Sequence, residues 1–232
     1  MNLENLLEWR RSYRKFDESK PLSKEDIDEI LSSIKFASCA NNRQYLRFIS
    51  VESRDLVLEI FENTKWAASL ADNMGRPKEG ERPVYFIAIL SNDEKKLRFN
   101  GIDEGLVISN LTLTAAEKGI GSCIIGSVSD KKMREILNYE DNYSCEVVIA
   151  FGYPKVKSSI KEIDAGEDQS YYLEEDSNYI VPKYKIKDLV RRIWWQKKVL
   201  TKNWRRRQSY ILLTHWVPWL LGFLPPCLWA QF

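Results

Sequence analysis

A run of seven apolar residues, VYFIAIL at 84–90, constrains the fold of this chain more than any other stretch. A strand with one face in water alternates apolar and polar residues, so an uninterrupted apolar run predicts a strand that is buried on both faces. The segment CEVVIAFGYP at 145–154 has the same character and ends in a turn. Because both faces of such strands must be covered, the sequence predicts an α+β sandwich with helices on both sides of a mixed sheet.

The remaining elements follow from apolar spacing and capping residues. The expected helix N-caps are Ser23, Ser53 and Ser129. A long segment, 101–118, is apolar on more than one face, so we expect a helix buried in the core or in a subunit interface, with Gly119 as its C-terminal cap. The expected helices lie at about 3–9, 24–34, 54–70, 101–118 and 130–137, and the further strands at 47–51 and 121–128.

Charge divides the chain of 232 residues into a body, 1–190, and a C-terminal extension, 191–232. No acidic residue follows Asp188, whereas the extension holds eight of the 35 Lys and Arg residues and six of the eight tryptophans. The body is therefore mildly acidic and the extension strongly basic. This pattern does not resemble a nucleic-acid-binding domain; it is typical of a globular body with an appended segment.

Histidine and cysteine usage excludes several kinds of catalytic site. The single histidine, His215, lies in the extension, so the body cannot build a Ser-His-Asp or Cys-His site or a zinc site that uses histidine. The four cysteines show no CxxC or other metal-ligand spacing, and the N-terminus lacks the long apolar run of a signal peptide. We therefore expect reduced thiols, no metal and a cytoplasmic body, in which a carboxylate, a lysine or a bound cofactor carries any chemistry.

Three stretches of the body could contact a ligand, and each has a plainer interpretation. RRSYRKF at 10–16 concentrates arginines that suit a phosphate, but it could be a solvated helix end. SCANNRQ at 38–44 offers amides that suit a flat heterocycle, or it is an Asn-rich turn. GIGSCIIG at 119–126 lets a backbone approach a ligand, or is a strand with turn glycines; it is neither a Rossmann nor a Walker A motif.

In this order, and followed by VPKYKIKDLV at 181–190, these stretches resemble the FMN-dependent nitroreductase family over about residues 5–190. The resemblance implies a three-layer α+β sandwich with a mixed, mainly antiparallel sheet flanked by helices. It also implies a homodimer that exchanges terminal segments and binds FMN at its interface, in contact with both subunits.

The resemblance further implies which residues bind the phosphate and the polar edge of FMN. The implied phosphate-binding residues are Arg10, Arg11, Ser12 and either Lys183 or Lys185. Arg14 matches the cation that reaches the polar edge of the flavin, where positive charge stabilises the reduced, anionic form.

The flavin ring is implied to lie against two further segments. The loop contributes Ser38, Cys39, Asn42 and Gln44, and the strand contributes Ile124, Ile125 and Gly126. The chain departs from the family pattern at several positions: Ser38 and Cys39 replace Pro-Ser, Tyr45 and Leu46 replace Pro-Trp, and Tyr184 replaces a basic residue. These departures bear on substrate preference more than on flavin binding.

The implied activity is a ping-pong transfer of a hydride from NAD(P)H, through flavin N5, to a small-molecule acceptor such as a nitroaromatic or a quinone. No catalytic side chain is required, which agrees with a body that has no histidine. The sequence does not distinguish NADH from NADPH. A different class of function stays open: a flavin-binding protein that has lost turnover and acts as a membrane-tethered interaction module.

The extension combines tryptophan and basic residues with an apolar run at 210–224, a composition typical of segments at a membrane interface. The run is shorter than the roughly 20 apolar residues of a spanning helix, and Pro218, Pro225 and Pro226 disfavour one continuous helix. Three interpretations stay open: a peripheral membrane anchor, a segment that covers a hydrophobic patch of its own dimer, and a remnant without a selected role.

Overall fold

The computed structural model describes residues 2–67, 70, 75–92, 100–174 and 178–192. The chain divides into two compact units, Met1–Asp188 and Leu189–Phe232. Nearly all of the second unit, and with it most of the predicted C-terminal extension, lies outside the described residues. The account below therefore concerns Met1–Asp188.

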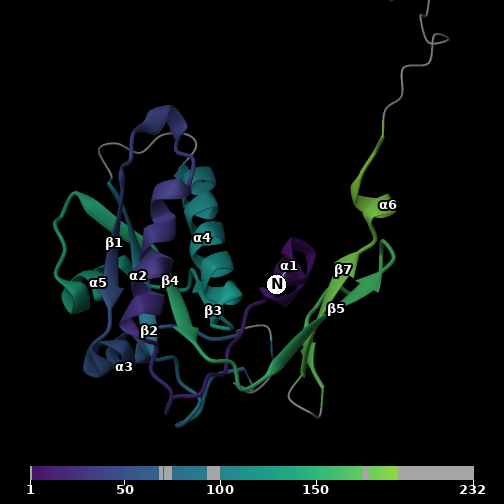
Figure 1. Ribbon diagram of the computed structural model, residues 1–232, viewed down its shortest axis with the longest axis horizontal. Coiled ribbons are helices and arrows are strands. Elements are labelled where there is room, and N and C mark those ends of the chain that lie inside the picture. Colours follow the sequence, from purple (N-terminus) through teal and green to yellow (C-terminus); the bar gives the residue numbers. More distant parts are fainter. Residues whose placement is uncertain (1, 68–69, 71–74, 93–99, 175–177, 193–232) are drawn as a thin grey trace, which may run out of the picture. The chain divides into compact units, whose positions relative to one another are not determined.

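A four-stranded sheet with the order β1-β2-β4-β3 forms the centre of this unit (Figure 1). The strands are β1 (Leu46–Val51), β2 (Tyr85–Asn92), β3 (Gly121–Ile125) and β4 (Tyr143–Gly152). Every pairing within this sheet is antiparallel. All eight residues of β2 are buried, which confirms the prediction drawn from its apolar run.

Helices cover both faces of the sheet, because the side chains of β2 alternate between two cores. Phe86, Ala88 and Leu90 pack in one core, together with α3 (Arg54–Glu62) and α5 (Asp130–Leu137). Tyr85, Ile87 and Ile89 pack in the other, together with α2 (Lys24–Ser32) and α4 (Asn100–Glu117). The predicted three-layer α+β sandwich is thereby confirmed.

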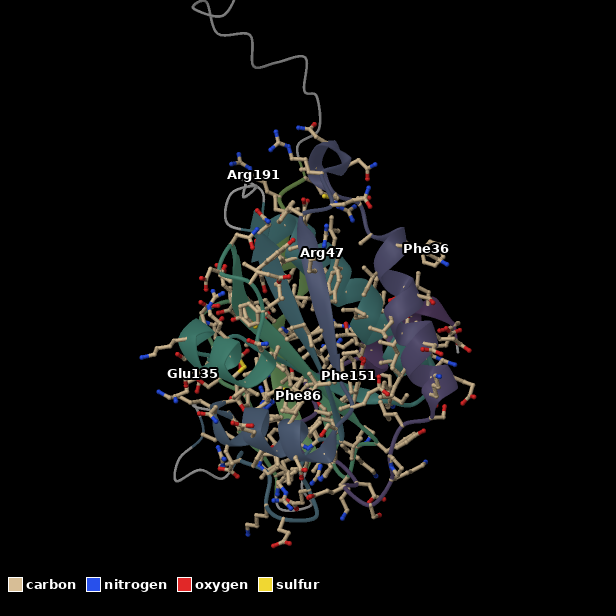
Figure 2. The ribbon with its side chains drawn as sticks, turned by 90° about the vertical axis from the view of Figure 1, so that its left-hand side faces the viewer. Phe36, Arg47, Phe86, Glu135, Phe151 and Arg191 are labelled. Carbon is tan, nitrogen blue, oxygen red and sulfur yellow. The ribbon has the colours of Figure 1, made fainter. Side chains whose placement is uncertain are left out.

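A view of the side chains distinguishes residues of the interior from residues that point outward. Figure 2 shows Phe86 and Phe151 among the packed side chains of the interior, and both are fully buried. Phe36 and Glu135 point outward from opposite sides of the body in the same view. Phe36 is 74% exposed, which is unusual for an aromatic side chain at the end of a helical segment, here the 3-10 turn Ser33–Phe36.

The N-terminal segment runs from α1 (Leu3–Trp9) along β3 and the end of β4. The amide of Tyr13 donates to the Ser122 carbonyl at 2.9 Å, and Phe16 forms an isolated bridge with Pro154. The rings of Tyr13 and Phe16 are buried. We call residues 10–16 the strap.

Two glycines make room for the strap. A Cβ added at Gly152 would lie 2.9 Å from the Cβ of Phe16. One added at Gly121 would lie 2.9 Å from the ring of Tyr13. Real Cβ atoms essentially never approach other atoms so closely, so the absence of a side chain at these positions is a packing requirement. The glycine at position 121 is therefore explained by packing within the chain.

A second sheet, not predicted from the sequence, has the order β5-β7-β6. It consists of β5 (Lys157–Ile163), β6 (Tyr172–Leu173) and β7 (Asn178–Tyr184), followed by α6 (Ile186–Leu189). β5 and β7 are parallel, which gives the fold its mixed character. Most of β5 is exposed, so its sequence KSSIKEI lacks the apolar signal that identifies a strand.

Several predicted boundaries were wrong. The third helix ends at Glu62 rather than Leu70, because the chain turns at Thr64, whose hydroxyl accepts a hydrogen bond from Trp66 Nε1 at 3.0 Å. The strand expected over 121–128 ends at Ile125. Ser23 caps its helix through its side chain, at 3.0 Å from the Asp26 amide, whereas Ser53 and Ser129 precede helices without such a bond.

The helix predicted at 101–118 is present as α4, but it is not buried on all sides within one chain. Its buried face carries Val107 and Leu111, while Ile102 is 59% exposed and Leu106 41% exposed. Gly119 follows with φ +70°, as expected for a C-terminal cap. Within the described part of the chain, no helix is both long and apolar enough to cross a membrane.

We expect Gly152→Ala to lower the free energy of unfolding by about 1–3 kcal/mol, because the new methyl group overpacks the site of Phe16. Urea unfolding followed by circular dichroism measures the change. Gly101→Ala is the matched control, because nothing lies within 4 Å of a Cβ at that exposed helical position. It should be neutral or stabilise by up to about 1 kcal/mol. Equal midpoints for Gly152→Ala and the parent protein would contradict the packing argument.

Candidate functional site

The strap and the exposed end of β3 bring together the first group of predicted site residues. Ser12 and Ser122 form a parallel bridge, so the backbone of the strap lies beside the start of β3. At the other end of β3, Ile125 is buried and Ile124 is 43% exposed. Gly126 is exposed, and a Cβ added there would meet only the Glu146 carbonyl oxygen, at 4.0 Å. This end of the strand therefore offers open surface.

The arginines of the strap carry uncompensated positive charge. Within the described residues, Arg10, Arg11 and Arg14 form no salt bridge with a carboxylate. By contrast, Arg54 and Arg82 both pair with Glu18. Charges that are left unpaired near a partly buried surface favour a bound counter-ion.

Arg11 shows the clearest unmet interaction. One of its terminal nitrogens donates to the Leu7 carbonyl, but its Nε is buried and has no hydrogen-bond partner. Burial, and secondly the neighbouring charge of Arg10, lower the pKa of Arg11. An anion beside the strap would satisfy the Nε donor and offset both effects.

The Arg14 side chain contacts two aromatic rings of the same chain. Its Nη1 donates to the Ser12 carbonyl at 3.3 Å. The centre of its guanidinium group lies 4.5 Å from the ring centroid of Tyr171 and 5.5 Å from that of Tyr179. Both rings come from the second sheet and its approach, a region that the sequence had not associated with the strap.

The second group of predicted residues lies in the loop 38–44, which Asp103 holds in place. The amide of Ala40 donates to both carboxylate oxygens of Asp103, at 3.2 and 3.0 Å, and the Cys39 thiol lies 3.2 Å from Oδ2. The amide of Gln44 donates in turn to the Cys39 sulfur at 3.3 Å. Cys39 thus links the loop to α4.

Three residues of this loop have positive φ angles, a backbone conformation that few residue types adopt readily. Asn41, Asn42 and Gln44 have φ values of 52°, 51° and 47°. Asparagine visits this left-handed region more readily than most residues, which explains the asparagine pair, whereas Gln44 is held there by its surroundings. The Gln44 Nε2 donates to Asn42 Oδ1 at 3.2 Å, and both side chains are exposed.

Sequence reasoning missed Asp103 as a site residue. It is 4% exposed, although it lies in a helix that is otherwise small and apolar in character. The available signal was an acidic pair, Asp103 and Glu104, within a segment expected to be buried. A buried carboxylate needs hydrogen-bond donors, and the loop supplies them.

A cavity of about 360 Å³ lies against the loop. Its floor is apolar, with Leu46, Phe48 and Val107 from β1 and α4. Ser38, Cys39, Asn42 and Gln44 line its polar side, and Lys35 and Arg47 add positive charge. A flat, partly polar ring system is the kind of ligand that such a mixture of walls suits.

The predicted C-terminal lysines do not join the strap in this chain. Lys185 forms an ion pair with Asp164 at 2.7 Å, and Lys187 binds the same carboxylate at 2.8 Å. Hydrogen bonds from these two lysines lower the pKa of Asp164 to about 2. Lys183 is exposed on β7, opposite Glu162.

The predicted residues thus form separate groups within one chain. Ser12 joins Arg10, Arg11 and Arg14 to β3, and Asp103 organises the loop 38–44. In the part of the chain that the structure describes, no hydrogen bond or ion pair links a residue of the strap to one of the loop.

We expect Asp103→Asn to destabilise the protein by about 1–3 kcal/mol, because the amide cannot accept hydrogen bonds at both positions and leaves buried donors unpaired. The loop should become more sensitive to limited proteolysis near Arg43. Glu117→Gln, at an exposed position at the end of the same helix, is the control. Unchanged stability and an unchanged cleavage pattern for Asp103→Asn would show that the loop does not depend on this carboxylate.

The two buried cysteines, Cys123 and Cys145, should be unreactive toward alkylating reagents at mildly alkaline pH. Burial raises the pKa of Cys123 to about 11 and that of Cys145 to about 12. Because the thiolate is the reactive form, both should resist iodoacetamide at pH 8 in the folded protein and react only at much higher pH or after unfolding. Peptide mass spectrometry of a Cys227→Ser variant measures the labelling of each cysteine, with the half-buried Cys39 as the comparison. Rapid labelling of Cys123 at pH 8 would contradict the prediction.

Comparison with known proteins identifies the family to which this arrangement belongs. The sequence model of the nitroreductase family matches residues 7–153, well over half of the chain. The structure is similar to that of an FMN-dependent nitroreductase from Clostridium difficile, with a TM-score of 0.57 and 25% identity, covering 67% of this chain and 89% of the other.

Two curated relatives are similar over the same part of the chain. A protein of Archaeoglobus fulgidus, provisionally named NADH dehydrogenase/NAD(P)H nitroreductase, is 28% identical over 164 residues, which cover 67% of this chain and 87% of the relative. An iodotyrosine deiodinase of Thermotoga neapolitana is 25% identical over 171 residues, 66% of this chain and 88% of the relative. Taken with the family match over strap, loop and sheet, these findings show that the chain belongs to the nitroreductase family.

Proposed function

We propose that this protein is an oxidoreductase that binds FMN and uses NAD(P)H to reduce a small-molecule acceptor such as a nitroaromatic or a quinone. The observation that carries the proposal is the strap, where Arg10, Arg11 and Arg14 lack carboxylate partners and the buried Nε of Arg11 lacks any partner. Membership of the nitroreductase family and the similarity to an FMN-dependent nitroreductase support FMN as the anionic ligand.

The strap residues fit the phosphate end of FMN. Arg10 and Arg11 would donate to phosphate oxygens, and the exposed hydroxyl of Ser12 adds a further donor. Binding would give the Arg11 Nε a charged acceptor and would neutralise part of the Arg10–Arg11 repulsion. Lys183 and Lys185 are additional candidates for the same phosphate, and Lys185 would have to leave Asp164 to reach it.

The flavin ring would lie between the exposed end of β3 and the loop 38–44, which a second copy of the chain would supply. Ile124 offers an apolar contact, and open surface beside Gly126 and the backbone at Ile125 allows close approach. The amides of Asn42 and Gln44 can both donate and accept at the polar edge of a flavin, while Ser38 and Cys39 line the adjacent cavity. Arg14 would place positive charge near that edge.

Bound FMN would supply the redox chemistry, by accepting a hydride at N5 from NAD(P)H and passing it to the acceptor in a ping-pong cycle. The chain itself would bind, orient and stabilise charge, without a catalytic acid or base. This division of labour is consistent with the lack of histidine in residues 1–190.

We propose that the functional unit is a homodimer. Because strap and loop lie in separate groups within one chain, the loop that completes the site would come from a second copy. Exposed apolar side chains on neighbouring helices offer a surface for it: Leu3 and Leu7 on α1, and Ile102 and Leu106 on α4. A face of this composition on two adjacent helices is typical of a subunit interface.

A cytoplasmic location and a peripheral membrane contact through 191–232 stay predictions. Residues 193–232 lie outside the described part of the chain. Flotation of full-length protein with vesicles, compared with a protein ending at residue 190, tests the membrane contact directly.

The purified protein should be yellow, and its flavin absorbance should bleach on addition of NADPH or NADH under anaerobic conditions. Steady-state oxidation of NAD(P)H with menadione or nitrofurazone then measures turnover. A colourless protein that takes up no added FMN would overturn the proposal. Bound flavin without turnover would instead favour the flavin-binding interaction module.

Arg10→Ala and Arg11→Ala should each weaken FMN binding about 10-fold to 100-fold, because a charge-assisted hydrogen bond is worth roughly 1.5–3 kcal/mol. Quenching of free FMN fluorescence measures the dissociation constant. Arg76→Ala is the matched control, since Arg76 pairs with Glu62 and is not part of the strap. Full retention of FMN by both strap variants after dialysis would show that the phosphate binds elsewhere.

A further inference from the structure

Among the contacts that the strap makes beyond the part of the chain matched by the family, one involves a charged side chain of the predicted site. Arg14 faces Tyr171 and Tyr179, whereas the family match ends at residue 153. The small sheet β5-β7-β6 therefore reaches the strap through aromatic rings. The family match does not cover this sheet, so the contact with Arg14 is what indicates a role for the sheet in the site.

The small sheet holds the two rings in place. Tyr179 lies on β7, is fully buried and belongs to the core on the α3 and α5 side of the central sheet. Tyr171 immediately precedes β6, is half-buried and packs against the same core. The pairing of Leu173 with Tyr179 fixes β6 beside β7, so one piece of sheet presents both rings to one guanidinium group.

An aromatic face can hold an arginine side chain without occupying the N–H donors that a ligand would bind. A guanidinium group that lies over a ring is attracted to the ring through the face of its own plane, and its N–H donors lie in that plane. A carboxylate partner would instead occupy those donors and cancel the charge. In the described residues, the Ser12 carbonyl is the one hydrogen-bond acceptor that Arg14 uses, so most of its donors stay available.

The Tyr179 ring also stays neutral beside the cation. Burial raises the pKa of Tyr179, which outweighs the opposite effect of the Arg14 charge. The hydroxyl of Tyr179 is buried without a hydrogen-bond partner, so the ring contributes its face rather than a charged oxygen. The contact with Tyr179 is therefore between a cation and an uncharged aromatic surface.

We propose that Tyr171 and Tyr179 are positioning residues that hold the Arg14 guanidinium at the flavin edge of the site with its charge and in-plane donors free. The small sheet beyond the family match thereby tunes both the affinity for FMN and the ease of its reduction. This inference rests on the proposed function, since it assigns Arg14 to the flavin.

The first arm of the test uses the protein without FMN and examines the contact itself. Urea unfolding of Arg14→Met, Tyr171→Met and the double variant forms a double-mutant cycle, in which methionine keeps much of the packed volume but has no aromatic face. The unfolding equilibrium constants should be non-additive by about 3-fold. Tyr172→Met, at the neighbouring exposed position, is the control and should be additive with Arg14→Met. Additivity for Tyr171 as well would overturn the proposal.

The second arm uses the FMN-loaded protein. Tyr171→Met should weaken FMN binding about 5-fold and lower the midpoint potential of the flavin, because the positive charge that favours the reduced anion is less well placed. Tyr171→Phe keeps the aromatic face and should restore both values. In an Arg14→Met background, Tyr171→Met should have no further effect on either value.

The outcomes separate the inference from the function on which it rests. Coupling in the first arm, together with a parent protein that takes up no FMN, would disprove the proposed function and the assigned role of the rings, while the contact stands. Coupling with a parent that binds FMN, but with an unchanged potential and affinity in Tyr171→Met, would overturn the positioning role alone. Loss of affinity that Tyr171→Phe does not rescue would also overturn it, because the face would then not be what matters.

Discussion

The burial of β2 on both faces is the constraint on which the rest of the structure depends. A strand with no solvent-facing side cannot lie at the surface, so each neighbouring strand and helix must contribute cover. The alternation of its side chains creates two cores: α2 and α4 fill one, and α3 and α5 fill the other. The predicted ligand-binding residues of the strap, of the end of β3 and of the loop that α4 holds lie at the margins of this arrangement.

Prediction from the sequence succeeded where local pattern and tertiary environment agree. The apolar run at 84–90 implied two covered faces, and the three-layer sandwich followed. The family resemblance was confirmed because its motifs occur in order along most of the chain. The assignment of individual residues to FMN stays a prediction, although the unpaired donor of Arg11 gives it a physical basis.

Prediction failed where the deciding interaction joins distant residues. Asp103 lies in a segment expected to be buried, but its partners, the Ala40 amide and the Cys39 thiol, are about sixty positions away in the chain, where no local pattern reveals them. The strands of the second sheet were missed because Lys157–Ile163 is mostly exposed and carries no apolar alternation. From the sequence, Gly121 could equally have served a ligand; the side chains of Pro154 and Tyr13 beside it show why a Cβ is excluded.

The strap has a further consequence, which concerns the order of folding. Its partners, Ser122 and Pro154, lie more than a hundred residues away along the chain. Such distant pairings contribute nothing until the intervening chain is ordered, so the strap should dock only after β3 and β4 have formed. The arginine cluster would then be among the last parts of the body to take shape.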